Sequence, residues 1–155
     1  MTTMLKSIKE YFDTYLLPDA AGSTRDPDAQ IRMAVAVLLI EIAEADFEQA
    51  PEERSAVLEA IERQFQLDRQ AAQTLMRLAE REHAESTDYF QFTSLINRHY
   101  SPEQKIKVIE SLWRVAFADQ QLHHYEEHVI RRLAELIYVS HKDFIAAKHR
   151  VMSAL

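Results

Sequence analysis

The chain has 155 residues, a hydrophobic content of 47% and a formal net charge of −7, which excludes a disordered chain and suits one domain with a sizeable core. The acidic balance argues against a nucleic-acid-binding protein, which usually needs a basic face. With only one glycine and four prolines there is little material for tight hairpins, so we expect an all-α fold of about eight helices. The absence of cysteine excludes disulfides and thiolate metal sites.

The first 27 residues are predicted to form a helix and a loop. Apolar residues recur at helical spacing over 2–16, a stripe that either packs on the domain or lies on a membrane surface as a peripheral contact. Two prolines and the only glycine fall within 17–27, which indicates a loop. We expect residues 28–155 to form the helical domain, with the whole chain folding as one compact unit.

The second predicted helix runs from about Asp28 to Asp46 and is apolar almost all round, as expected of a buried central helix. Its longest apolar run, 33–40, is far shorter than the roughly 20 residues of a membrane-spanning helix. The N-terminus lacks the apolar core and cleavage site of a signal peptide. We therefore expect a cytoplasmic protein with no transmembrane segment.

Six more helices follow in the sequence, each with a recognisable start. The start signals are Pro51, Asp68, the triplet Ser86-Thr87-Asp88, the capping box Ser101-Pro102-Glu103-Gln104, the second acidic turn, and Ser140. Helical spacing predicts an inward face on each, and these faces include His99, Leu136 and Met152 near the helix ends.

An internal repeat links two acidic turns. Asp46 and Asp119 differ by 73 positions, and so do Glu53 and Glu126. Residues 39 and 112 are both leucine in the same ungapped register, and residues 43 and 116 are both alanine. Internal similarity of this kind indicates a duplicated unit, so we predict two helix–turn–helix units related by a pseudo-two-fold axis.

The first acidic turn (residues 46–53) is a candidate cation site. Asp46 ends a buried helix, where the helix dipole disfavours negative charge, whereas Glu53 lies in the first turn of the next helix. Carboxylates held close together repel one another unless a cation, an arginine or a proton joins them. A hard divalent ion is one interpretation; the other is that these acids simply accept amide hydrogen bonds as helix caps.

The second acidic turn (residues 119–126) adds histidines to the same pattern. His123 and His124 precede Glu126 and Glu127, with Tyr125 between them, and His128 follows. His124 and His128 are four positions apart on one helix face, a spacing that can chelate zinc or nickel. Residues 124–128 read HYEEH, which is not the HExxH of zinc peptidases because a tyrosine stands in place of the catalytic glutamate. The calcium loop of an EF-hand is also excluded, because its spaced carboxylates and central glycine are missing.

These turns resemble the tellurite-resistance TerB-like family, whose pattern is Ala-x-Ala-Asp at a helix end and a glutamate seven residues later. The two copies here run from Ala43 through Asp46 to Glu53 and from Ala116 through Asp119 to Glu126. The resemblance covers about residues 28–150. It implies an all-α bundle, an acidic site proposed to bind a metal ion, stress-response or membrane-associated partners, and no established enzymatic activity.

Three functional hypotheses remain. The leading one is a non-enzymatic TerB-like module that binds calcium, magnesium or manganese and serves as a sensor or scaffold for a protein partner. Its predicted ligands are Asp46, Glu53, Asp119 and Glu126, with His123, His124 and Glu127 as additional candidates that would shift the preference to zinc or nickel. The second is a metal-free module whose acidic face binds a basic protein partner. The third, a metal-dependent hydrolase using the histidine-bearing turn, has the least support.

Overall fold

The computed structural model describes residues 27–44, 51–86, 88–118 and 124–155, and in these ranges it is all helical with no strand. The described helices are α2 (Pro27–Glu44), α3 (Pro51–Phe65), α4 (Arg69–Glu85), α5 (Phe90–His99), α6 (Pro102–Ala116), α7 (His124–Leu136) and α8 (His141–Ser153). The all-α prediction is confirmed. The helix predicted for 2–16 and the loop that follows it lie outside the described residues, apart from Pro27.

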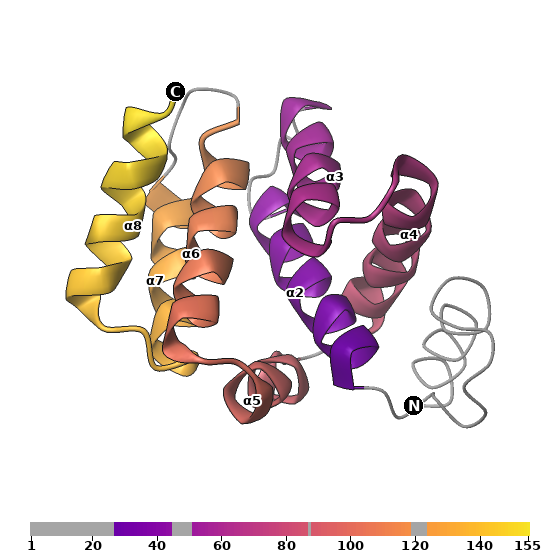
Figure 1. Ribbon diagram of the computed structural model, residues 1–155, viewed down its shortest axis with the longest axis horizontal. Coiled ribbons are helices and arrows are strands. Elements are labelled where there is room, and N and C mark those ends of the chain that lie inside the picture. Colours follow the sequence, from indigo (N-terminus) through magenta and orange to yellow (C-terminus); the bar gives the residue numbers. More distant parts are fainter. Residues whose placement is uncertain (1–26, 45–50, 87, 119–123) are drawn as a thin grey trace.

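The helix α2 is the centre of the molecule, as its apolar sequence predicts. Every residue from Met33 to Ile40 is buried, because α2 packs against α3, α4, α5 and α6. Figure 1 shows α2 between α4 and the group formed by α6, α7 and α8. The described part of α2 ends at Glu44, and the predicted end at Asp46 lies outside the described residues.

The three helices α2, α3 and α4 have counterparts in α6, α7 and α8, with α5 linking the two groups (Figure 1). Gln66 and Tyr138 follow α3 and α7 with positive φ of 54° and 61°. Beyond them, the amides of Leu67 and Val139 each donate back to a carbonyl five residues earlier, at 3.2 and 2.9 Å. This is the same Schellman-type helix end twice, at residues 72 positions apart where the sequence repeat has 73, so the likeness of the two halves extends to the ends of α3 and α7.

Three predicted helix starts are confirmed by side-chain hydrogen bonds. Asp68 accepts from the amide of Ala71 at 2.8 Å, and Ser140 accepts from the amide of Asp143 at 3.2 Å. Ser101 and Gln104 form the complete capping box, with both reciprocal hydrogen bonds present. These caps satisfy amides that have no partner within their own helix.

The predicted cap of the fifth helix is only partly right. The N-cap position is Tyr89, which forms no side-chain cap, although the Asp88 carboxylate accepts from the amide of Phe90 at 2.9 Å. Ser86 instead ends α4, and its hydroxyl donates to the carbonyl of Glu82 at 2.7 Å. Thr87 lies outside the described residues. A polar triplet between two helices can cap either one, and only the fold decides which.

Three residues predicted to face inward are exposed. His99, Leu136 and Met152 lie in the last turns of α5, α7 and α8, and the two apolar ones are 39% and 47% exposed. The remaining predicted faces are buried or packed against the core. Helical spacing identifies a stripe, but it does not tell how far along the helix a neighbour covers that stripe.

Candidate functional site at the paired acidic turns

Of the seven predicted ligands, the structure describes the side chains of three. Asp46, Asp119 and His123 lie outside the described residues, and nothing is described of the His124 side chain, although that residue begins α7. The described ligands are Glu53, Glu126 and Glu127, all in the first turns of α3 and α7. The structure therefore describes only the part of the proposed site that the first turns of α3 and α7 contribute.

Glu53 and Glu126 are buried at matching positions. Each is the third residue of its helix, and their exposed fractions are 1% and 0%. Glutamate is rarely buried to this extent, and a buried carboxylate is costly unless hydrogen bonds or a positive charge compensate it. The first helical turn supplies part of that compensation through its free amides and its dipole. The repeat thus places a buried acid beside each turn.

Glu127, the next residue of α7, forms an ion pair within the protein. Its carboxylate accepts from the Nζ of Lys148 at 3.0 Å. The same ammonium lies 5.4 Å from the centroid of the Trp113 ring, and the Trp113 indole N–H donates to the carbonyl of Phe144 at 3.2 Å. In the described structure Glu127 therefore fastens α8 to α7, a role that competes with ligation of a cation.

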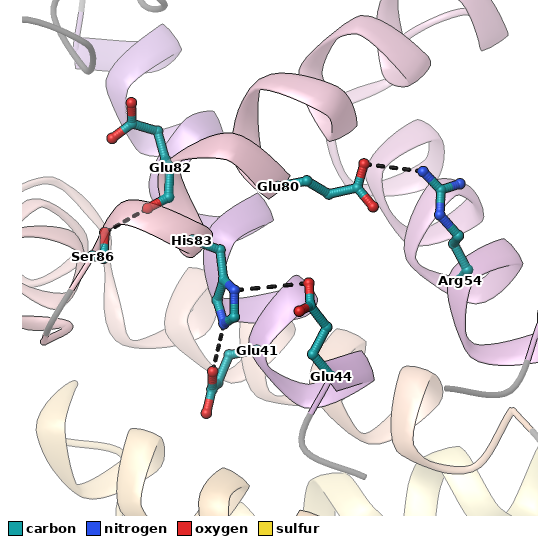
Figure 2. A network of polar contacts seen from close by, with 7 residues as sticks. All are labelled: Glu41, Glu44, Arg54, Glu80, Glu82, His83 and Ser86. Carbon is teal, nitrogen blue, oxygen red and sulfur yellow. Dashed lines mark hydrogen bonds and ion pairs between the residues drawn. The ribbon is translucent and has the colours of Figure 1, made fainter. Parts of the chain in front are cut away.

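A second polar cluster lies at the end of α2, before the first acidic turn. Figure 2 shows His83 of α4 reaching Glu41 and Glu44 of α2. The Nε2 of His83 is 2.6 Å from Glu41 Oε1, and the Nδ1 is 3.7 Å from Glu44 Oε2. The hydrogen bond to Glu41 raises the pKa of His83, burial of the ring opposes this, and Glu44 adds to the rise.

The tyrosine before α5 joins this cluster. Burial raises the pKa of the Tyr89 hydroxyl above its ordinary value, and the hydrogen bond to Glu41 raises it further. A hydroxyl that stays protonated at every physiological pH can only donate to Glu41, since a carboxylate accepts. Glu41 is thus approached by two donors from two segments that follow it in the chain.

Two ion pairs join α3 to α4, and neither of them involves an acid of the first turn. Arg54, the only base between residues 41 and 62, pairs with Glu80 of α4 at 3.0 Å (Figure 2). Arg69 of α4 pairs with Glu62 at 3.1 Å. The sequence gives no sign of His83 and Arg69 as partners of these acids, because Glu41 and Glu62 lie 42 and 7 positions away from them. Spacing within one helix cannot indicate these ion pairs, because their two members lie on different helices.

Within the described ranges, no three histidine, aspartate or glutamate side chains gather closely enough to hold a metal ion. Glu53 and Glu126 alone do not make such a group. A complete cation site at these turns needs the predicted ligands in 45–50 and 119–123, which lie outside the described residues.

A groove of about 550 Å³ lies between α3 and the C-terminal ends of α6 and α8, and Pro51 and Glu52 of the first acidic turn are among its lining residues. Its walls are mostly small or apolar, with Ala56, Ala60, Ala118 and Val151 among them. Glu52 lines the groove, whereas Glu53 and Glu126 do not. The groove is therefore separate from the buried acids of the repeat.

Comparison with known proteins agrees with this arrangement. The family model described as "Tellurite resistance protein TerB" matches residues 32–149, which is more than half of the chain and includes both turns. Neither the comparison with curated proteins nor that with solved structures found a match. No helix in the described residues combines the length and the apolar character that crossing a bilayer requires. The match to the family model covers both repeated units, and the chain belongs to the TerB family.

Proposed function

We propose that this chain is a non-enzymatic module that binds a divalent cation at its two acidic turns. The ligands from the first turn would be Asp46 and Glu53, and those from the second would be Asp119 and Glu126. The bound ion would join the two helix–turn–helix units and present a defined surface to a protein partner.

The main support for this proposal is that Glu53 and Glu126 are both buried, each as the third residue of its helix. Two glutamates 73 positions apart are withdrawn from solvent in the first turns of equivalent helices. A cap on an exposed turn can stay in water, whereas a buried carboxylate needs compensating charge or hydrogen bonds. Helix amides and the dipole provide some of this compensation, and a cation shared with the neighbouring aspartate would provide more.

The donor set suggests which ion the site prefers. Four carboxylates offer only oxygen, which suits calcium, magnesium or manganese. Participation of His123 and His124 would shift the preference towards zinc or nickel. Glu127 fits less well as a ligand, because Lys148 already binds its carboxylate at 3.0 Å.

Thermal unfolding of the chelated protein tests the proposal. Calcium, magnesium, manganese, zinc and nickel are added one at a time, and one of them should raise the melting temperature. An ion at about 100 times its Kd adds about 2.7 kcal/mol to the free energy of unfolding. Glu53→Gln and Glu126→Gln should each reduce this increment. In chelator alone the same two variants give the baseline melting temperatures from which each ion-dependent increment is measured.

Glu52→Gln is the matched control, because Glu52 is the exposed neighbour of Glu53 in the same helical turn. It should keep the full ion-dependent increment. If none of the ions stabilises the wild type, the cation proposal fails and the metal-free alternative, an acidic module for a basic partner, takes its place. Turnover of ester or phosphate substrates by the wild type would contradict the non-enzymatic part.

We also propose that the module acts in a tellurite or general stress response with a protein partner. The support is the description of the matching family model. Deleting the gene and restoring it as wild type or as Glu53→Gln tests this, with growth in the presence and absence of tellurite as the measurement. Equal growth of the deleted and restored strains under tellurite would contradict the proposal.

A further inference from the structure

The imidazole of His83 lies between two carboxylates. Its Nε2 is 2.6 Å from Glu41 and its Nδ1 is 3.7 Å from Glu44. The side chains of His83 and Glu41 are each 16% exposed, and that of Glu44 is 35% exposed. These contacts join the last turn of α4 to the last turn of α2 (Figure 2).

This arrangement is most favourable when both ring nitrogens carry a proton. An ionised carboxylate only accepts hydrogen bonds, and a neutral imidazole has one N–H and one lone pair. Neutral His83 can therefore donate to Glu41, but it then presents a lone pair to Glu44. The protonated ring instead faces one acid with each N–H.

The last turn of α2 carries two acidic side chains and no basic one. Glu41 and Glu44 are three positions apart, so they share one face of the helix and repel each other. The negative end of the helix dipole adds to that repulsion, and Glu41–Glu44 contains no basic residue. The compensating cation must come from outside α2, and His83 supplies it from α4.

We propose that His83 is a proton-dependent clamp, which holds the last turn of α2 against α4 while its ring is protonated and releases that turn as the pH rises. The clamp acts directly before the first acidic turn, but it requires no cation and is independent of the proposed metal site. A chain with such a clamp changes the order of this helix end between mildly acidic and mildly basic conditions.

Within the part of the chain that the structure describes, the other titratable groups near Glu41 and Glu44 do not replace His83. Tyr89 donates to Glu41 but brings no positive charge, and neither does Tyr125 of α7, which lies near Tyr89. Arg54 of α3 is held by Glu80 of α4 at 3.0 Å. Glu82, on α4 itself, points away from His83 (Figure 2).

The sign of the pH dependence follows from the direction of the pKa shift. Glu41 and Glu44 raise the pKa of His83 in the folded protein. The stabilisation is therefore complete below the unfolded pKa of about 6.5 and is lost as the pH rises through the folded value. The release of the last turn of α2 thus begins above about pH 6.5.

Two measurements in the presence of chelator test the clamp. Proton–carbon NMR titration of the wild type should give His83 a pKa above that of a free imidazole, and Glu41→Gln should lower it. Hydrogen exchange, corrected for the intrinsic rate, should show more opening of Glu41–Glu44 at pH 8 than at pH 6. The increase should be about tenfold for each pH unit between the unfolded and folded pKa that His83 passes through.

Variants separate the clamp from general effects of pH. His83→Gln should make exchange at Glu41–Glu44 the same at both pH values, whereas His99→Gln should keep the wild-type difference because His99 is an exposed residue in the last turn of α5. A wild-type His83 that titrates at or below about 6.5 overturns the proposal. Equal wild-type exchange at pH 6 and pH 8 does so as well, and neither outcome depends on whether His83→Gln folds.

Discussion

Three glutamates, Glu53, Glu82 and Glu126, are buried within the described residues. Glu53 and Glu126 are explained by their places in the repeat, whereas Glu82 of α4 has no counterpart in α8. Its exposed fraction is 3%. Burial raises the pKa of the Glu82 carboxyl, and the negative charge of Glu85 raises it further. At this position, unlike at His83, the charged form of the side chain is the disfavoured one.

We expect Glu82→Gln to stabilise the protein at neutral pH by roughly 1 kcal/mol, the usual scale for a buried polar group that is poorly satisfied. Because the folded pKa is raised, the penalty is absent below the unfolded value and grows as the pH rises through the folded one. Urea unfolding at pH 4 and pH 7 measures this difference. Glu135→Gln, on the exposed face of α7, should have little effect, and a destabilised Glu82→Gln at pH 7 would contradict the prediction.

At the scale of the helix, the two Schellman-type ends are the clearest mark of duplication in the backbone. Gln66 and Tyr138 adopt positive φ, a region that costs residues other than glycine about 1–2 kcal/mol. Both side chains are exposed. The ammonium of Lys105 lies 5.7 Å from the Tyr138 ring centroid, a contact that offsets part of the cost at this site.

We predict that Gln66→Gly stabilises the protein by up to about 1 kcal/mol, because glycine adopts positive φ without a steric penalty. Tyr138→Gly should stabilise the protein less than Gln66→Gly, because it also removes the contact with Lys105. The matched control is Gln73→Gly, at an exposed position inside α4, which should cost about 1 kcal/mol. Chemical denaturation measures all three, and the same sign for Gln66→Gly and Gln73→Gly would disprove the interpretation.

At the scale of the molecule, the two halves share one core. The helix α6 packs against both α2 and α3 of the other half, and the buried apolar residues form one continuous cluster from α2 to α8. Leu39 and Leu112, which match in the repeat, are both fully buried. A single cooperative domain stays a prediction, which unfolding experiments can test.

Leu39→Ala should destabilise both halves together, by about 2–5 kcal/mol, because it leaves a cavity in the shared core. Trp113, the only tryptophan, is buried in α6 and reports on the C-terminal half. Its fluorescence transition should shift with the far-ultraviolet circular dichroism, as two-state unfolding requires. Leu112→Ala is the matched variant, and an unshifted Trp113 transition in Leu39→Ala would show that the halves unfold separately.

The features that depend on neighbouring residues were predictable from the sequence. Helix starts at Asp68, Ser101 and Ser140 follow from hydrogen bonds that span three residues, and the buried faces follow from helical spacing. The acidic motifs stand out in the sequence because duplication repeats the pattern 73 positions later. The TerB-like fold was predicted for the same reason, and the match over residues 32–149 confirms it.

Contacts between distant helices were decided only by the tertiary structure. His83 meets Glu41 across 42 positions and Lys148 meets Glu127 across 21, and neither pairing leaves a pattern in the sequence. The complete burial of Glu53 and Glu126 also depends on which helices cover them. Local backbone hydrogen bonds and apolar spacing determine where helices form, whereas the partners of their charged side chains depend on how the helices pack.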